Sequence, residues 1–203
     1  MAYRERHGLT HALALRDQFF IASGIDPDNG DTFFGDFDLS EQVPVIIAAK
    51  NNAAATRRSV LKQLILTQRR VVSDAPLLLW TALDPTYRYG SGGVQVTPVS
   101  VRPQWTTAGT EHRAQLEVYY GSASDPGLAS PELLATAPNA NTRWMHPIAI
   151  QAAEGLTQAI DLESELWVNA VGSVLFYLVA EDGATIAPES AFQLSFVEEP
   201  LPS

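Results

Sequence analysis

The sequence predicts an all-β protein: a jelly-roll-like antiparallel β-sandwich that follows an extended, partly helical N-terminal arm. Three observations favour this fold class. From residue 43 onward, apolar segments of strand length follow one another. Turn clusters such as "SDAP", "GSASDPG" and "EDGATIAPES" separate them at intervals of about 8 to 20 residues. No helical segment long enough for a parallel crossover lies between them. We therefore expect an arm over residues 1–41 and a sandwich domain over residues 42–203.

The arm begins with "LTHALALRDQFFIASG", a segment typical of a short helix with Thr10 as N-cap and Gly24 as its end. The next stretch, "GIDPDNGDTFFGDFDLSEQ", places five aspartates around three phenylalanines and lacks the regular apolar pattern of a core element. Three aromatic side chains in so thin a segment need a surface to pack on. We therefore expect Phe33, Phe34 and Phe37 to be anchors that contact their own sandwich or a neighbouring subunit.

The sandwich begins with two apolar segments, "VPVIIAAK" and "RRSVLKQLILTQRRVV". The second also fits a helix, because Leu61, Leu64 and Ile65 would share one helical face, but its strand-like context favours a strand. The later expected strands are "PLLLWTAL", "GVQVTPVSVR", "AQLEVYYG", "RWMHPIAIQ", "LTQAIDL", "ELWVNAV", "SVLFYLVAE" and "AFQLSFVEE". Pro98 lacks an N–H and indicates an edge or a bulge. In the last segment, apolar and polar residues alternate as in a half-buried strand.

Composition excludes several classes of function. The chain has no cysteine, which excludes disulfides, a thiolate nucleophile and a cysteine-based zinc site. No apolar run reaches the roughly 18 residues that span a bilayer, and we expect no signal peptide and no membrane partner. Residues 71–203 carry four arginines against fifteen acidic residues, so this region would repel a phosphate backbone and we expect no nucleic-acid partner.

Basic residues gather in residues 57–70, where Arg57 and Arg58 precede Lys62, Arg69 and Arg70. A cluster of this kind could face an acidic partner, and Arg57 and Arg58 are candidate partner contacts. The alternative is that these side chains are solvated strand ends.

The acidic and histidine-bearing segments do not match established metal motifs. An EF-hand counted from Asp26 fails at its fifth, sixth and twelfth positions, although Asp26, Asp28 and Asp31 could still hold calcium in another geometry. His7 and His11 have helical spacing but lack the glutamate of a zinc-protease motif. We expect no metal and no other cofactor.

No catalytic residue is assigned. His112 and His146 are scattered, and we expect the first to be solvated and the second to be a hydrogen-bonded core or rim residue. Glu117, Glu163 and Glu165 are the strand-borne carboxylates that a glycoside hydrolase could use, but their alternation places them on solvent-facing sides.

Aromatic residues outside the expected strands raise a second hypothesis. Trp80 and Trp167 lie in apolar strands and are expected in the core. Trp105, Tyr87 and Tyr89 lie in loop-like sequence, where exposed rings could stack on a sugar, so they are candidate glycan contacts.

Three stretches carry a resemblance to a known group of proteins. They are "VPVIIAAKNNAAATRRSVLKQLILT", "LLLWTALDPTYRYGSGGVQVTPVSVRP" and "IDLESELWVNAVGSVLFYLVAEDG" with "AFQLSFVEE". Over residues 43–199 the chain resembles the β-sandwich structural proteins of tailed bacteriophage particles, the head decoration (cement) and fibre-like group. The resemblance implies a homo-oligomer, commonly a trimer, that clamps the major capsid protein or another virion protein with its N-terminal arm. It also implies a place in the virion, after assembly in the host cytoplasm, and no catalytic residues.

The preferred function is therefore a non-enzymatic capsid decoration protein that stabilises a virus head. The alternative is a carbohydrate- or receptor-binding module of a fibre or spike. A sandwich-fold hydrolase or lyase that uses Glu117 or Glu163 is the third reading.

Overall fold

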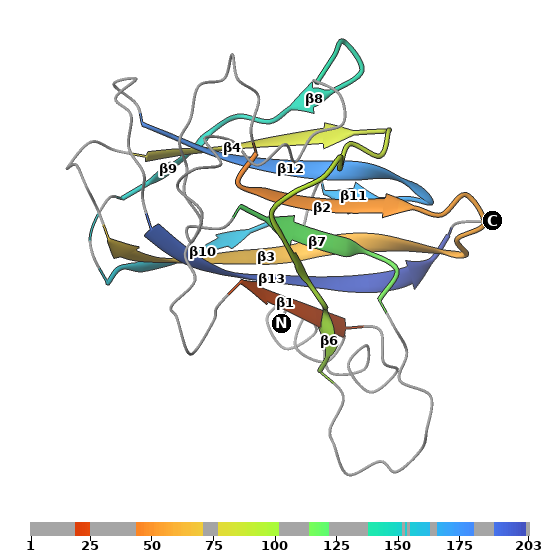
Figure 1. Ribbon diagram of the computed structural model, residues 1–203, viewed down its shortest axis with the longest axis horizontal. Coiled ribbons are helices and arrows are strands. Elements are labelled where there is room, and N and C mark those ends of the chain that lie inside the picture. The colour runs from red at the N-terminus through yellow and green to blue at the C-terminus, as the bar shows by residue number, and fades with distance from the viewer. Residues whose placement is uncertain are drawn as a thin grey trace, which may run out of the picture.

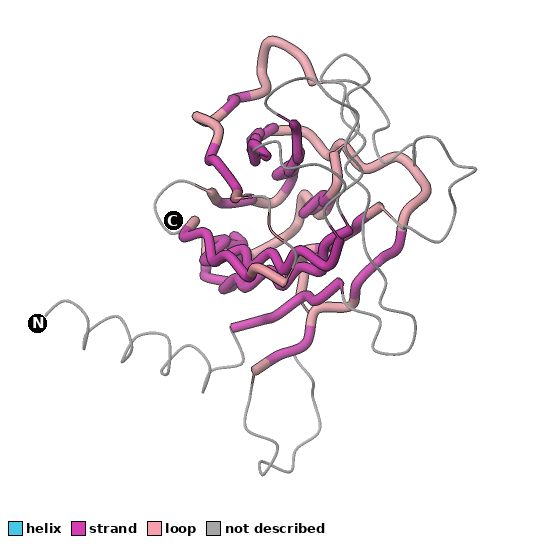
Figure 2. The backbone as a smooth tube through the Cα atoms, turned by 90° about the vertical axis from the view of Figure 1, so that its left-hand side faces the viewer, coloured by secondary structure: helices cyan, strands magenta, loops and turns pink. Residues whose placement is uncertain are grey.

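The computed structural model describes a sandwich of two antiparallel β-sheets, so the all-β prediction is confirmed (Figure 1). It describes residues 19–24, 44–70, 77–101, 114–121, 138–151, 153, 155–162, 166–180 and 189–201. These residues contain no helix, and so no helix among them could cross a membrane. Figure 2 shows the same fold turned by 90°.

Sheet A has six strands, in the order β10-β3-β13-β1-β6 with β11 also beside β3. Sheet B has seven, in the order β5-β7-β2-β12-β4-β8 with β9 also beside β4. The bounds are β1 Phe19–Gly24, β2 Ile46–Asn51, β3 Arg57–Arg70, β4 Leu77–Asp84, β5 Val94–Val96, β6 Val99–Ser100, β7 Glu117–Tyr120, β8 Arg143–Trp144, β9 Ile148–Ile150, β10 Thr157–Asp161, β11 Trp167–Val168, β12 Val171–Ala180 and β13 Glu189–Pro200.

The strand pairing is nested. The first strand, β1, pairs with the last, β13, and β2 pairs with β12. Further in, β3 pairs with β10 and β11, and β4 with β8 and β9. The chain thus runs out and back like one long hairpin, and the β13–β3 and β12–β4 pairs roll this hairpin into two sheets. Strands β5, β6 and β7 lie between β4 and β8 in the sequence and extend the sheet edges.

The main core lies between the two sheets. The predicted apolar face of β13 lies here, because Phe192, Leu194 and Phe196 are buried with at most 1% of their surface exposed, but the strand is not half-buried as predicted, since Ser195 is buried too. Phe196 stacks on Phe20 of β1, with ring centroids 5.4 Å apart. Burying one such side chain contributes about 1.5–3 kcal/mol, which makes this interface the main stabilising element.

Sheet B is also buried on its other side. Ile47, Leu175 and Tyr177 face away from the main core and are fully buried in a second apolar cluster, together with Ala49, Ala82 and Tyr119. This explains why "VLFYL" in β12 is continuously apolar instead of alternating, since a strand buried on both faces has no solvent side.

The prediction of an arm over residues 1–41 with a helix ending at Gly24 is wrong for residues 19–24. These residues form β1, whose six residues pair with β13. Phe20 and Ala22 are fully buried and alternate with half-buried neighbours, so the period is that of a strand. At Gly24, a Cβ atom would lie 2.1 Å from Cε1 of Phe192, so the missing side chain lets this ring cover the strand end. The rest of the expected arm, with Phe33, Phe34 and Phe37, lies outside the described residues.

The segment that fitted both a helix and a strand is a strand, β3. The basic positions are spread along its fourteen residues, because a strand rises about 3.3 Å per residue and the Cα atoms of Arg58 and Arg69 are therefore about 36 Å apart. The expected single strand around Pro98 is two short edge strands, since the chain passes from β5 in sheet B to β6 in sheet A at Thr97 and Pro98.

Candidate functional site

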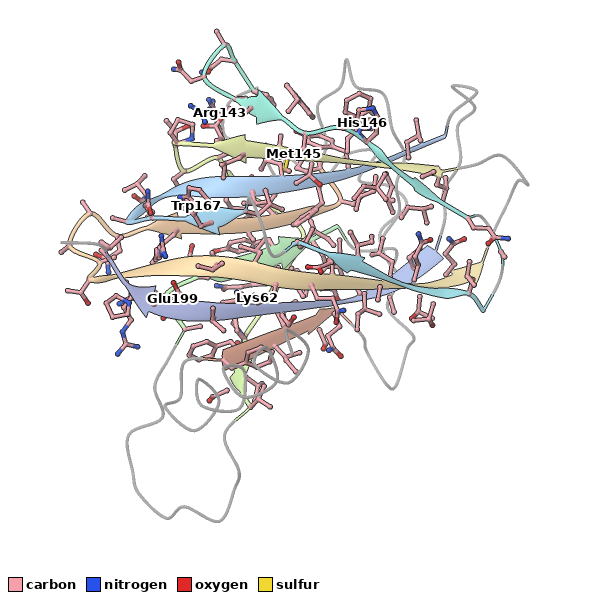
Figure 3. All side chains as sticks on the ribbon, turned by 180° about the vertical axis from the view of Figure 1, so that it is seen from behind. Lys62, Arg143, Met145, His146, Trp167 and Glu199 are labelled. Carbon is pink, nitrogen blue, oxygen red and sulfur yellow. The ribbon has the colours of Figure 1, made fainter. Side chains whose placement is uncertain are left out.

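The described residues do not form a metal site, since no group of three or more His, Asp or Glu side chains in this part of the chain could hold an ion. His146 is exposed, with its Nδ1 atom 3.0 Å from the carbonyl oxygen of Pro147, so it lies at the rim (Figure 3). The other candidate ligands and acids, His7, His11, Asp26, Asp28, Asp31, His112, Glu163 and Glu165, lie outside the described residues.

Tyr87 and Tyr89, two of the candidate glycan contacts, cover the second apolar cluster on the outer face of sheet B. They follow β4 on the loop of residues 85–93, in which Gly92 and Gly93 have positive φ angles of 82° and 65°. The Tyr89 ring stacks on Tyr119 of β7, with centroids 3.5 Å apart, and meets Tyr87 edge-on at 6.4 Å. Both loop tyrosines are half-buried, so each keeps part of its surface for a ligand.

Glu117 is the polar centre of this tyrosine group. The sequence predicted an ordinary surface residue, but the side chain is half-buried and accepts hydrogen bonds from Tyr87 Oη at 2.8 Å and Tyr119 Oη at 3.2 Å. Burial raises the pKa of both tyrosines, and the neighbouring carboxylate adds to this because a phenolate would place a second negative charge beside it. The two hydroxyls therefore remain donors. We call Tyr87, Tyr89, Tyr119 and Glu117 the tyrosine group.

A buried carboxylate fixes the start of this loop. The side chain of Asp84, at the end of β4, is fully buried and pairs with Arg88, with Oδ2 and Nη2 3.0 Å apart. Its other oxygen accepts from Thr86 N at 2.9 Å and from Thr86 Oγ1 at 2.5 Å, while Thr142 Oγ1 donates to Oδ2. Burial acts to raise the pKa of Asp84, but these hydrogen bonds outweigh it and hold the pKa below its usual value.

A second buried ion pair bridges the two sheets. Lys50 of β2 and Glu198 of β13 are both fully buried, with Nζ and Oε1 4.0 Å apart. Lys50 Nζ also donates to Arg57 O at 2.9 Å and to Ser59 Oγ at 3.3 Å. Glu198 Oε1 accepts the backbone N–H of Gln115 at 2.6 Å. Sequence reasoning missed both pairs, because a charged residue at the end of an apolar strand is usually solvated; only the Asp84-Pro-Thr turn signal pointed toward one of them.

A second aromatic group lies at the edge of sheet B. Trp144 of β8 is 41% exposed and packs against Trp80 at 6.3 Å and Tyr177 at 5.3 Å between ring centroids. Trp80 is half-buried, on the outer face of the sheet and not in the main core. Trp167, also expected in the core, is 43% exposed because β11 points it away from the partner sheet, so that expectation is wrong. Trp105 lies outside the described residues.

The candidate partner contacts Arg57 and Arg58 lie at the start of β3 and are half-buried. Arg58 is neutralised by Glu199 of β13, with Nη2 and Oε2 3.0 Å apart. This ion pair leaves Arg58 less free to bind an acidic partner, and a partner role for Arg57 and Arg58 stays a prediction.

The comparisons with known proteins name no family. No family model matches the chain, and no curated protein matches it. Among solved structures, the chain is similar to one described as the unassembled VP1 pentamer of KI polyomavirus, at 10% sequence identity and a TM-score of 0.31, over 91% of this chain and 93% of that chain. A TM-score this low does not establish a common fold, so the fold of this chain is defined by its own strand pairing.

Proposed function

We propose that this chain is a non-enzymatic structural subunit of a virus particle and that its sandwich is a jelly roll. The observation that carries the proposal is the nested strand order, in which the chain is one long hairpin rolled into two sheets. Jelly rolls of this kind build viral capsid domains, lectins and cupins. The fold therefore limits the function to a few classes of protein, and the residues on the surface distinguish between these classes.

The described surface favours an assembly role over a chemical one. Two of the ion pairs among the described residues, Asp84 with Arg88 and Lys50 with Glu198, are buried inside the protein, where the first fixes a loop and the second bridges the sheets. The described surface instead exposes large apolar residues, namely Val99, Val101, Trp144, Ile148 and Trp167. Exposed apolar side chains on edge strands are typical of protein–protein contacts.

The specific form of the proposal is a decoration protein on the head of a tailed bacteriophage. It oligomerises, as a trimer, and the segment between β1 and β2 reaches a neighbouring subunit through Phe33, Phe34 and Phe37. Each aromatic side chain buried in such a contact contributes about 1.5–3 kcal/mol before ordering costs. Repetition over a shell would multiply this effect through multivalency.

The test compares two triple variants in the same segment, F33S/F34S/F37S and D26N/D28N/D31N. The proposal predicts that the wild-type chain is recovered by mass spectrometry from purified particles and is oligomeric by light scattering. The phenylalanine variant should stay folded, by thermal melting, but lose particle association. The aspartate variant should keep it, because the aspartates form turns. A chain absent from particles, or association that survives loss of the phenylalanines, would contradict the proposal.

A glycan-binding module is the second candidate, favoured by the tyrosine group. Half-buried tyrosine rings with a carboxylate at their centre offer a stacking face and a hydrogen-bond acceptor for sugar hydroxyls. On a glycan array, Tyr89→Ala and Trp105→Ala should each abolish retention, whereas Trp144→Ala should not. An array on which the wild-type chain retains nothing would exclude this function.

A further inference from the structure

Sheet A carries an apolar row across its outer face. Leu61 of β3, Phe196 of β13 and Phe20 of β1 belong to the main core, so the residues next to them in each strand point the other way. Trp167 of β11 pairs with Val60 of β3, Val60 pairs with Val197 of β13, and Val197 pairs with Phe19 of β1. The N–H of Val101 donates to the carbonyl of Phe19 at 3.0 Å, which extends the row to the β6 edge. The row is Trp167, Val60, Val197, Phe19 and Val101.

The exposed area of this row is at its two ends. Val197 in the centre is fully buried, and Val60 and Phe19 are half-buried. At one edge Trp167 is 43% exposed, and at the other Val101 is 41% and the adjacent Val99 is 67% exposed. In the view from behind, Trp167 lies between β12 and β3 (Figure 3), whereas Figure 1 shows β6 below β1. Outer faces of antiparallel sandwiches are usually polar, so the exposed apolar side chains at the two ends of this row are candidate contact sites.

The chemistry of the two ends fits a second copy of this chain. One end is a single large aromatic ring and the other is a pair of small branched side chains, which are complementary in size. The neighbouring charges do not oppose the contact, because Arg58 and Glu199 on the same face neutralise each other although the chain has a net charge of −10. Two acidic chains can therefore approach here with less repulsion than elsewhere.

We propose that Trp167 of one copy packs against Val99 and Val101 of the next, in a head-to-tail contact between opposite edges of sheet A. Such a contact uses two different patches, so it does not close on itself in a dimer but continues until a ring closes. The inference rests on the homo-oligomer of the proposed function and assigns it an interface. A ring of three copies agrees with the trimer proposed above.

Disulfide trapping tests this contact in a chain that has no native cysteine. The double variant W167C/V99C carries one cysteine at each end of the row. Four strand spacings of about 4.8 Å separate the two positions within one chain. A disulfide needs Cα atoms within about 7 Å, so a bond can form only between copies. Under mild oxidation we expect a ladder of covalent oligomers on a non-reducing gel that ends at the trimer.

Two kinds of control accompany the double variant. The single variants W167C and V99C should not cross-link, because each cysteine then meets a native side chain. The double variant Q193C/V99C should not cross-link either, since Gln193 lies in the middle of the same face on β13. Trp167→Gln should shift the mass in solution from trimer to monomer without lowering the melting temperature, which separates loss of the contact from loss of the fold.

Each outcome decides one point. A ladder that stops at two copies would overturn the head-to-tail arrangement. An oligomeric wild type whose W167C/V99C variant does not cross-link would overturn this interface but leave the proposed function standing. A monomeric wild type, found in particles or not, would overturn the interface and the trimer together.

Discussion

Lys50 and Asp84 are both buried charged residues, yet their surroundings act in opposite directions on their ionisation. Asp84 receives hydrogen bonds from Thr86 and Thr142 and an ion pair from Arg88, so its charged form is favoured. Burial lowers the pKa of Lys50, and Glu198 offsets this only in part while Arg57 adds to it. The difference is the number of groups that replace water around each charge.

Replacing Asp84 with Asn should lower the free energy of unfolding at pH 7 by about 3 kcal/mol, since it leaves Arg88 without its buried counter-charge. The folded pKa of Asp84 lies below its usual value of 3.8. Its stabilisation is therefore complete above that value and is lost as the pH falls through the folded pKa. Urea unfolding at pH 7 and in acid measures both effects, and the wild type and variant should converge in acid.

The matched control is Glu199→Gln, which removes a partly exposed ion pair with Arg58. Exposed pairs contribute about 1 kcal/mol or less, so this variant should lose little stability. An equal loss for both variants would contradict the role assigned to Asp84.

For Lys50, the prediction concerns alkaline pH. Because its folded pKa lies below 10.5, the unfolded chain binds more protons than the folded chain between these two values. The wild type should therefore gain stability as the pH rises through this window, by up to about 1.4 kcal/mol per pH unit. Lys50→Met should lack the gain. Measurements kept below about pH 9 limit ionisation of the tyrosines in the unfolded chain, and parallel pH profiles for the two proteins would refute the prediction.

Among the elements, β1 shows most clearly how packing overrides a local pattern. The residues "FFIASG" continue an apparent helix when read with the sequence before them, and Gly24 looks like its end. Six paired residues on β13 and the burial of Phe20 select the strand instead. The glycine is needed for a different reason, which is the close approach of the Phe192 ring.

Gly24→Ala should therefore destabilise the protein by about 1–3 kcal/mol, as overpacking of a well-packed site does. The double variant G24A/F192L should recover part of this loss, because the smaller side chain makes room for the methyl group. Thermal or urea unfolding of the two variants and of F192L alone forms a double-mutant cycle. A cycle without coupling between the two positions would show that the contact is absent.

At the scale of the whole molecule, the two outer faces of the sandwich differ. The outer side of sheet B carries the second apolar cluster and the tyrosines that cover it, with Trp144 exposed at the edge, whereas sheet A exposes both ends of its apolar row. A ligand at the tyrosine group and a partner copy at sheet A would therefore occupy different surfaces, and the two proposals can be tested independently.

Two truncations test where the sandwich begins. Removal of residues 1–18 should leave a cooperative thermal transition, since β1 keeps its pairing with β13 and β6. Removal of residues 1–24 also exposes β13. It should therefore abolish folding or lower the free energy of unfolding by at least about 3–5 kcal/mol, which is the loss typical of deleting one buried Phe. Similar melting temperatures for the two truncations would place β1 outside the folded unit.

Most of the strand order could be predicted from local pattern, but not the pairing or the roles of single residues. The segments that became β3, β12 and β13 are long enough and apolar enough to be recognised. The exposure of Trp167 and the burial of Glu198 could not be predicted from the sequence, because both depend on which side of a strand meets the partner sheet. Likewise, the tyrosine group forms only when a loop after β4 folds over β7.

The sequence alone determined an all-β sandwich without cysteine chemistry, because turn spacing and strand-length apolar runs are local properties of the chain. Only the tertiary structure decided that β1 belongs to the sandwich, that two ion pairs are buried, and that sheet A exposes an apolar row with complementary ends. These features depend on contacts between residues far apart in the sequence, such as Phe19 with Val197 and Lys50 with Glu198, whose free energies no local pattern records.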